Sequence, residues 1–261
     1  MRSISKSPFT DENALVTMIV FYQQKGSKMI KAVFFDLYHT LVRYEPPREE
    51  LMSEVLKGFG VEVKPEILRK PLVIADEFIY QEIARTPLNQ RSKEDKMALF
   101  ARHQEIVLKE AGIEANQKLI LGLLGKMQQF AMQLVLFDDV MPTLTDLKNR
   151  GLILGLISNV DSDITPLLNQ LGLTSWLQVV VTSQNAGFNK PQPEIFQAAL
   201  KQAEVQASEA IYIGDQYQVD VVGASKMGMR GVLLDRGDYF EETTDHPRIQ
   251  SLTQLVEHLS R

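Results

Sequence analysis

Short unbroken apolar runs and longer helical stripes follow one another along this chain. The first run, Ala32–Phe35, is bounded by polar residues and predicts a buried strand. Over residues 46–137 apolar residues recur at helical spacing, and the last helix predicted there runs from Asn116 through Leu134. This stretch shows no strand-like alternation, so it is predicted to be a block of helices.

After Pro142, helices alternate with short β-rich runs. Strands are predicted at 152–157, 178–181, 210–213 and 231–234, and helices up to Arg150, at 164–171, 193–204 and 219–227, and in a last segment ending near Leu259. This alternation predicts a parallel sheet with helices on both faces. The helical block therefore interrupts one α/β domain after its first strand. We expect the block to lie over the carboxyl ends of the strands, where such sheets bind ligands, as a lid.

These patterns divide the chain into an N-terminal extension (1–28) with no assigned role, an α/β core (29–45 and 138–261) and a helical insert (46–137). The longest apolar run, residues 14–22, contains Thr17. It is far shorter than the roughly 20 residues that span a bilayer. Asp11 and Glu12 precede it and no small-residue cleavage site follows, so a signal peptide is not expected. We therefore expect a cytoplasmic protein.

The composition is that of an ordinary globular protein and narrows the possible partners. The 261 residues are 44% hydrophobic and 23% charged, which excludes collagen-like and disordered classes. A formal net charge of −5 gives no overall attraction to nucleic acid or to an anionic membrane. The absence of cysteine excludes disulfides, thiolate metal sites and a cysteine nucleophile. A small-molecule substrate is the expected partner, and the sequence indicates no oligomeric state.

Polar residues follow several predicted strands where each one ends. The carboxyl ends of parallel strands meet at one edge of a sheet, so these residues are expected to converge. They are Asp36 and Thr40, Ser158 and Asn159, Lys190, and Asp215 with Asp220. Three carboxylates that share a site repel one another unless a cation lies among them, and Mg²⁺ is the natural one. A lysine and a hydroxyl beside them suit a phosphate or another anion.

Four motifs in this order resemble those of the haloacid dehalogenase superfamily of aspartyl-nucleophile hydrolases. They are FFDLYHTL, LISN, NKPQPEIF and IYIGDQYQVD, and the resemblance covers about residues 30–240. It is to the subfamily in which a helical cap is inserted after the first motif. The resemblance implies a Rossmann-like three-layer α/β core with a parallel sheet and an inserted α-helical cap domain.

The resemblance also implies a role for each motif residue. Asp36 would be the nucleophile and Thr40 the neighbour that orients it. Ser158 and Asn159 would contact the phosphate, and Lys190 would neutralise both nucleophile and substrate. Asp215 would bind Mg²⁺ together with Asp36, the backbone carbonyl of Tyr38, and Asp220 in or beside the coordination sphere.

One departure from the family pattern bears on the reaction. Phosphatases of the superfamily usually carry a second aspartate two residues after the nucleophile, which protonates the leaving alcohol, and this chain has Tyr38 there. A tyrosine is similar to the true haloacid dehalogenases, whose leaving halide needs no proton. Those enzymes lack the metal-binding aspartates of the fourth motif and place an arginine early in the cap. This chain keeps Asp215 and Asp220 and has no arginine within 71–82.

The main hypothesis is a Mg²⁺-dependent phosphatase acting on a small phosphorylated metabolite through an aspartyl-phosphate at Asp36. Tyr38, with an ordinary pKa of about 10, is a slow acid, and His39 or water is the alternative proton donor. Two other hypotheses stay open. One is a metal-independent 2-haloacid dehalogenase with an ester intermediate, and the other is a non-catalytic binding or regulatory protein of the same fold.

Overall fold

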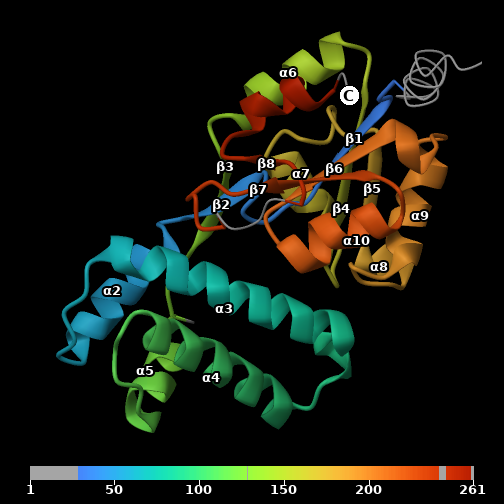
Figure 1. Ribbon diagram of the computed structural model, residues 1–261. Helices are drawn as coiled ribbons and strands as arrows, with labels where there is room; N and C mark the ends of the chain where they lie inside the picture. The colour runs from blue at the N-terminus through green and yellow to red at the C-terminus, as the bar shows by residue number, and fades with distance from the viewer. Residues whose placement is uncertain (1–28, 128, 241–244, 260–261) are drawn as a thin grey trace, which may run out of the picture.

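The computed structural model describes residues 29–127, 129–240 and 245–259, so the N-terminal extension lies outside the described residues. Its centre is a six-stranded parallel sheet in the order β5-β4-β1-β6-β7-β8 (Figure 1). The strands are β1 (Ala32–Phe35), β4 (Ile153–Ser158), β5 (Val179–Thr182), β6 (Ala210–Gly214), β7 (Arg230–Leu234) and β8 (Arg248–Ile249). In the central register Phe35 pairs with Leu156 and Ile213. The residues that follow these three positions therefore emerge at one edge.

Helices cover both faces of this sheet because successive side chains of each strand point to opposite faces. Val33 and Phe35 pack into one buried cluster, with α6 (Val140–Asn149), α7 (Thr165–Gln170) and the 3₁₀ segment η4 (Leu252–His258). Ala32 and Phe34 pack into the other, with α9 (Pro193–Gln202) and α10 (Gly223–Lys226). Figure 1 shows α6 on one side of the strands and α9 and α10 on the other. The predicted three-layer α/β core is confirmed.

The predicted segments after Pro142 are found with small shifts. The helix expected at 219–227 begins as the π-helical segment η3 (Tyr217–Val222), which continues into α10, and the last predicted helix is η4. The sequence did not predict the short helix α8 (Ser183–Ala186) or the 3₁₀ turn η2 (Ala207–Glu209).

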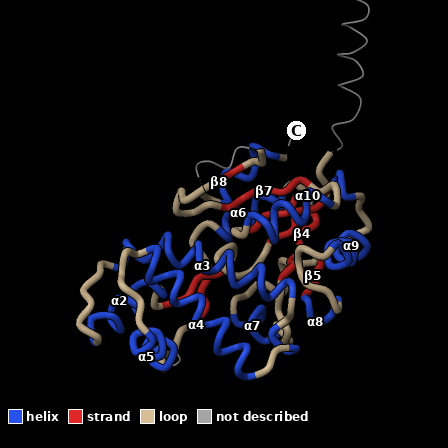
Figure 2. The backbone as a smooth tube through the Cα atoms, turned by 60° about the horizontal axis from the view of Figure 1, so that its bottom comes forward, coloured by secondary structure: helices blue, strands red, loops and turns tan. Residues whose placement is uncertain are grey.

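The insert forms a second group of helices with a hydrophobic core of its own. It comprises α2 (Arg48–Gly58), α3 (Pro65–Arg85), the 3₁₀ turn η1 (Leu88–Gln90), α4 (Lys93–Glu110) and α5 (Gln117–Met127). Their apolar stripes meet in a buried cluster that includes Leu56, Leu72, Val107 and Leu123. In Figure 2 these helices and the large sheet occupy different parts of the molecule.

The prediction that 46–137 contains no strand was wrong. β3 (Gln133–Leu136) pairs antiparallel with β2 (Val42–Glu45), and the two strands connect the core to the insert (Figure 1). Asn116 does cap α5 as expected, accepting a hydrogen bond from the backbone N–H of Leu119 at 2.9 Å. The helix ends at Met127, however, and Leu134 lies in β3. Apolar residues three or four apart fit a helical stripe whether or not the helix continues, and the partner strand is distant in sequence.

Candidate active site at the carboxyl edge of the sheet

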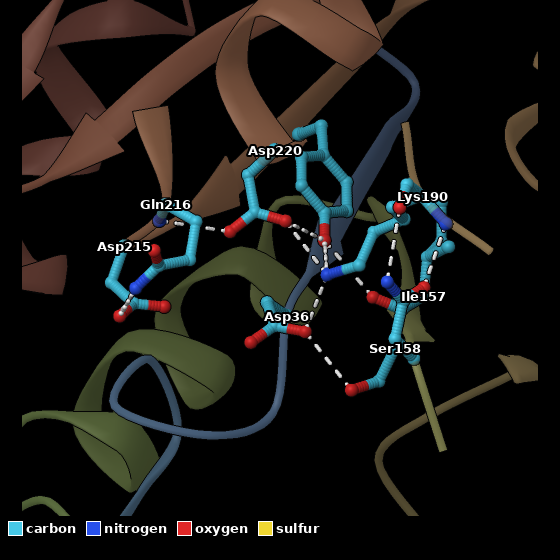
Figure 3. A network of polar contacts seen from close by, with 9 residues as sticks. Asp36, Ile157, Ser158, Lys190, Asp215, Gln216 and Asp220 are labelled. Atoms are coloured by element: carbon cyan, nitrogen blue, oxygen red, sulfur yellow. Dashed lines mark hydrogen bonds and ion pairs between the residues drawn. The ribbon is translucent and has the colours of Figure 1, made fainter. Parts of the chain in front are cut away.

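Asp36 lies directly after β1 and is buried, with 6% of its surface exposed. Its backbone N–H donates to the carbonyl of Ile213 at 2.8 Å, which extends the sheet pairing by one residue. Its carboxylate oxygen Oδ1 accepts hydrogen bonds from the Ser158 hydroxyl at 3.0 Å and from Lys190 Nζ at 2.6 Å (Figure 3). One neighbouring strand end and a distant loop therefore hold the carboxylate, and a second strand end holds the backbone of Asp36.

Lys190 is the hub of this cluster and is 3% exposed. Besides Asp36, its ammonium group donates to Asp220 Oδ1 at 2.7 Å and to the Tyr212 hydroxyl at 2.8 Å. An ammonium group has three N–H donors, so these three acceptors use all of them. The Tyr212 hydroxyl in turn donates to the carbonyl of Ile157 at 2.9 Å. The position of the lysine is thereby fixed by three separate elements.

Asn159 holds the backbone of Lys190 in place. Its Nδ2 donates to the Lys190 carbonyl at 3.0 Å, and its Oδ1 accepts from the Lys190 backbone N–H at 2.7 Å. Both polar atoms of its side chain are therefore used within the protein. The phosphate contact expected of Asn159 stays a prediction.

Asp36, Asp215 and Asp220 each place one carboxylate oxygen within 4.8 Å of the other two. Gln216 orients two of these side chains: its backbone N–H donates to Asp220 at 3.0 Å and its side-chain amide to Asp215 at 2.7 Å (Figure 3). Gly214 makes room for the cluster, because a Cβ atom there would lie 2.1 Å from Asp220 Oδ2. The fourth motif therefore supplies Asp215 and Asp220, and its Gly214 leaves the space that the side chain of Asp220 needs.

The electrostatics of the cluster show a shortage of positive charge. Burial raises the pKa of Asp215 well above its usual range, and the charges of Asp220 and Asp36 raise it further. Burial also raises the pKa of Asp220 to about 6, although Lys190 opposes the shift. Three carboxylates thus face one ammonium group. A divalent cation with oxygen ligands would relieve this repulsion, so the donor set fits Mg²⁺.

The remaining residues of the first motif lie around Asp36. Thr40 is fully buried, and its hydroxyl has no hydrogen-bond partner among the described residues. The ring of Tyr38 stacks on that of Tyr44 with centroids 6.4 Å apart, and burial raises the pKa of the Tyr38 phenol. His39 has a positive φ of 57°, and burial, with the charge of Arg48, lowers its pKa to about 4. Both side chains are therefore uncharged at neutral pH.

A cavity of about 390 Å³ opens beside the cluster and is lined by the core and the insert together. Asp215 and His39 belong to its wall. The same wall holds a group that the sequence did not predict: Asp76 on α3 binds Arg48 through both oxygens, at 3.1 and 2.5 Å, and His103 at 3.0 Å. The sequence does hold a signal for this group, because Asp76 is a carboxylate within the apolar stripe of the helix that forms α3. Tyr212 was also missed, because it lies in an apolar strand run.

Three comparisons with known proteins agree with this geometry. A family model described as haloacid dehalogenase-like hydrolase matches residues 30–228. A glyceraldehyde 3-phosphate phosphatase from Methanopyrus kandleri is 30% identical over 217 residues, covering 81% of this chain and 86% of the relative. Human haloacid dehalogenase-like hydrolase domain-containing protein 3 is 30% identical over 207 residues, covering 78% of this chain and 82% of the human protein. The solved structure of a 2-haloacid dehalogenase from Pseudomonas syringae has 27% sequence identity and a TM-score of 0.50. The match covers 89% of this chain and 99% of the dehalogenase chain.

Proposed function

This chain belongs to the haloacid dehalogenase-like hydrolases, and from that premise we propose that it is a Mg²⁺-dependent phosphatase of a small phosphorylated metabolite. The observation that carries the proposal is the cluster of three carboxylates within 4.8 Å of one another beside a buried lysine. A dehalogenase that works without metal has no use for two further acids at this site. The phosphatase relative from M. kandleri supports the same reaction class.

In the proposed reaction the carboxylate of Asp36 attacks phosphorus, the ester P–O bond breaks, and an aspartyl-phosphate forms. Lys190 and Ser158 hold the nucleophile by the hydrogen bonds described above. Lys190 also balances negative charge as it builds up on the phosphoryl oxygens. Water then attacks the aspartyl-phosphate, releases phosphate and restores Asp36. Thr40 is proposed to orient the nucleophile through its unpaired hydroxyl.

Mg²⁺ would be held by Asp36, Asp215, the backbone carbonyl of Tyr38, and Asp220 in or beside the coordination sphere. When bound, it supplies positive charge that offsets both the acidic cluster and the phosphate. The chain's own part is to fix the three carboxylates, which Gln216 and Lys190 do by direct hydrogen bonds.

Proton supply to the leaving group is the weak point of this site. The Tyr38 phenol, whose pKa is raised by burial, is a poor acid at neutral pH. His39 lines the cavity and carries an N–H even when uncharged, so it or a water molecule is the alternative donor. We therefore propose that the enzyme favours acidic leaving groups, such as acyl and aryl phosphates, over alkyl phosphates.

We further propose that residues 46–137 act as a cap that encloses the substrate. The cavity beside Asp215 supports this, because its wall combines residues of α2 and α3 with residues of the core. Among the described residues no helix is long and apolar enough to cross a membrane. The cytoplasmic location expected from the sequence stays part of the proposal.

A 2-haloacid dehalogenase is the second candidate, because Tyr38 occupies the acid position and the P. syringae dehalogenase has a similar fold. One experiment separates the two. Phosphate release from a panel of phosphorylated metabolites is measured with Mg²⁺ and with EDTA, beside an Asp36→Asn control. Chloride release from 2-chloropropionate is measured in EDTA. Mg²⁺-dependent phosphate release supports the phosphatase, chloride release in EDTA the dehalogenase, and neither product a non-catalytic protein.

A further inference from the structure

The wall of the cavity beside Asp215 is rich in arginine, although the chain as a whole carries a net charge of −5. Four arginines line it: Arg43 on β2, Arg48 at the start of α2, Arg69 on α3 and Arg236 after β7. They come from the insert, from the core and from the strand that connects the two. A ligand held near Asp215 would therefore lie among several guanidinium groups.

Two of the four acidic residues of this wall, Asp76 and Asp235, are almost completely buried. The side chain of Asp235 is 1% exposed and binds Arg248 at 2.9 Å. The side chain of Asp76 is 6% exposed and is held by Arg48. In contrast, the side chains of Arg43 and Arg69 are 38% and 49% exposed. Apart from Asp215, which we assign to the metal, only Glu49 at 20% offers appreciable negative surface within the described wall.

Arg69 has hydrogen-bonding capacity to spare. Its Nε donates to Glu49 at 3.1 Å, and this is its one hydrogen bond among the described residues. A guanidinium group carries five N–H donors, so both terminal nitrogens remain for another oxyanion. Arg48 and Arg236, by contrast, each bind a carboxylate through two nitrogens. Arg43 also makes a single hydrogen bond within the described chain, to Glu45, but its side chain is less exposed than that of Arg69. Arg69 is therefore the arginine of this wall best placed to receive a ligand.

We propose that the substrate carries a second acidic group, a carboxylate or a second phosphate, which binds Arg69 in the cavity while the scissile phosphate lies at Asp36. This rests on the proposed phosphatase function and adds the substrate class to it. A carboxylate and a phosphate present the same pair of oxygens to a guanidinium, so both meet the same recognition chemistry. Glu49 competes with the ligand for Arg69.

The test compares esters that differ in the second acid. One pair is 3-phosphoglycerate and glycerol 3-phosphate, and the other is fructose 1,6-bisphosphate and fructose 6-phosphate. For each pair the quantity measured is the ratio of kcat/KM between the diacid and the monoacid. Arg69→Gln should lower this ratio about 5- to 20-fold, mainly through KM, because the contact lies away from the reacting atoms. The substrate pair whose ratio falls more in Arg69→Gln shows whether the second acid is a carboxylate or a phosphate.

Two further variants make the test sharper. Glu49→Gln should raise the ratio about 2- to 5-fold, because it frees Arg69 from its competitor. Arg85→Gln is the matched control, since Arg85 lies on the same helix, pairs with Glu82 at 2.6 Å and is absent from the cavity wall. It should leave the ratio unchanged. If Arg69→Gln and Glu49→Gln both lower the ratio, the pair has a structural role and the proposal is wrong. An unchanged ratio in Arg69→Gln would also overturn it.

A binding measurement separates this proposal from the proposed reaction. In the Asp36→Asn background, 3-phosphoglycerate should bind more tightly than glycerol 3-phosphate by calorimetry, and Arg69→Gln should remove the difference. If this preference is found but no ester is hydrolysed by the wild type, the phosphatase function fails while the second-acid site stands. If the wild type hydrolyses p-nitrophenyl phosphate but no binding preference is found, the phosphatase function stands and the second-acid site is wrong.

Discussion

Two buried clusters of charge border the same cavity and differ in their balance. At the sheet edge Asp36 and Asp220 share one lysine, Asp215 lies beside them without that contact, and the pKa values of Asp215 and Asp220 are raised. In the insert Asp76 binds Arg48 and His103, and His39 lies 3.9 Å from it. Burial would raise the pKa of Asp76, but these three neighbours lower it well below its usual range. The first cluster lacks positive charge, whereas in the second the negative charge of Asp76 is balanced. A cluster with unbalanced negative charge is prepared for a cation, whereas a balanced cluster stabilises the structure.

The largest effect that tests this contrast is expected for Asp36→Asn. It should lower turnover by more than about 10³-fold, because the amide cannot form the covalent intermediate. The melting temperature should change little, since the neutral side chain also relieves repulsion from Asp215 and Asp220. Steady-state assays and thermal unfolding measure the two quantities. Retained activity would remove Asp36 from its assigned role.

Tyr38→Asp tests whether the missing acid limits the reaction. It should raise the hydrolysis of alkyl phosphates by up to about 10²- to 10⁴-fold and that of aryl phosphates much less, because only the basic leaving group needs a full proton. The gain should grow with the pKa of the leaving alcohol across a series of esters. Tyr38→Phe is the control, since it keeps the ring that stacks on Tyr44. A loss of stability with no gain would show that Tyr38 serves packing alone.

Asp76→Asn should break the balanced cluster and act on stability. Removing one partner of a buried pair typically costs about 3–5 kcal/mol, which denaturant unfolding would detect. Because the folded pKa of Asp76 is lowered, its contribution is present above about pH 4 and is lost as the pH falls further. The variant should therefore lose less stability on acidification than the wild type. Asp146→Asn, in an exposed pair with Arg150, is the control and should cost under about 1 kcal/mol.

Tyr212→Phe should have a smaller effect, on rate and not on binding. It removes one of the three acceptors of Lys190 and keeps the edge contact with Phe196. Losing one hydrogen bond to a charged group is worth about 1–2 kcal/mol, so kcat should fall about 5- to 30-fold while KM stays nearly constant. Tyr217→Phe, whose hydroxyl binds Asp245 away from the cluster, should not change kcat. Equal losses in both variants would contradict a positioning role for Tyr212.

The sequence predicts the sheet-edge cluster well and the insert's cluster not at all. Asp36, Ser158 and Asp215 follow strands, and the topology of a parallel sheet brings such positions to one edge. Arg48 and Asp76 are 28 residues apart and lie on two different helices, so their pairing depends on how those helices pack. β3 was missed for a similar reason, since its partner β2 lies far away along the chain. Local pattern gives elements and strand ends, but side-chain partners between elements come from tertiary packing.

Mg²⁺ binding tests most directly that the sheet-edge cluster is a cation site. The melting temperature of the wild type is measured with EDTA and with increasing Mg²⁺, beside Asp215→Ala and Asp76→Asn. A ligand that binds only the folded state adds RT ln(1 + [Mg²⁺]/Kd), about 1–3 kcal/mol at concentrations well above Kd. The wild type and Asp76→Asn should both be stabilised, and Asp215→Ala much less. No stabilisation of the wild type at millimolar Mg²⁺ would contradict the metal site and favour the dehalogenase.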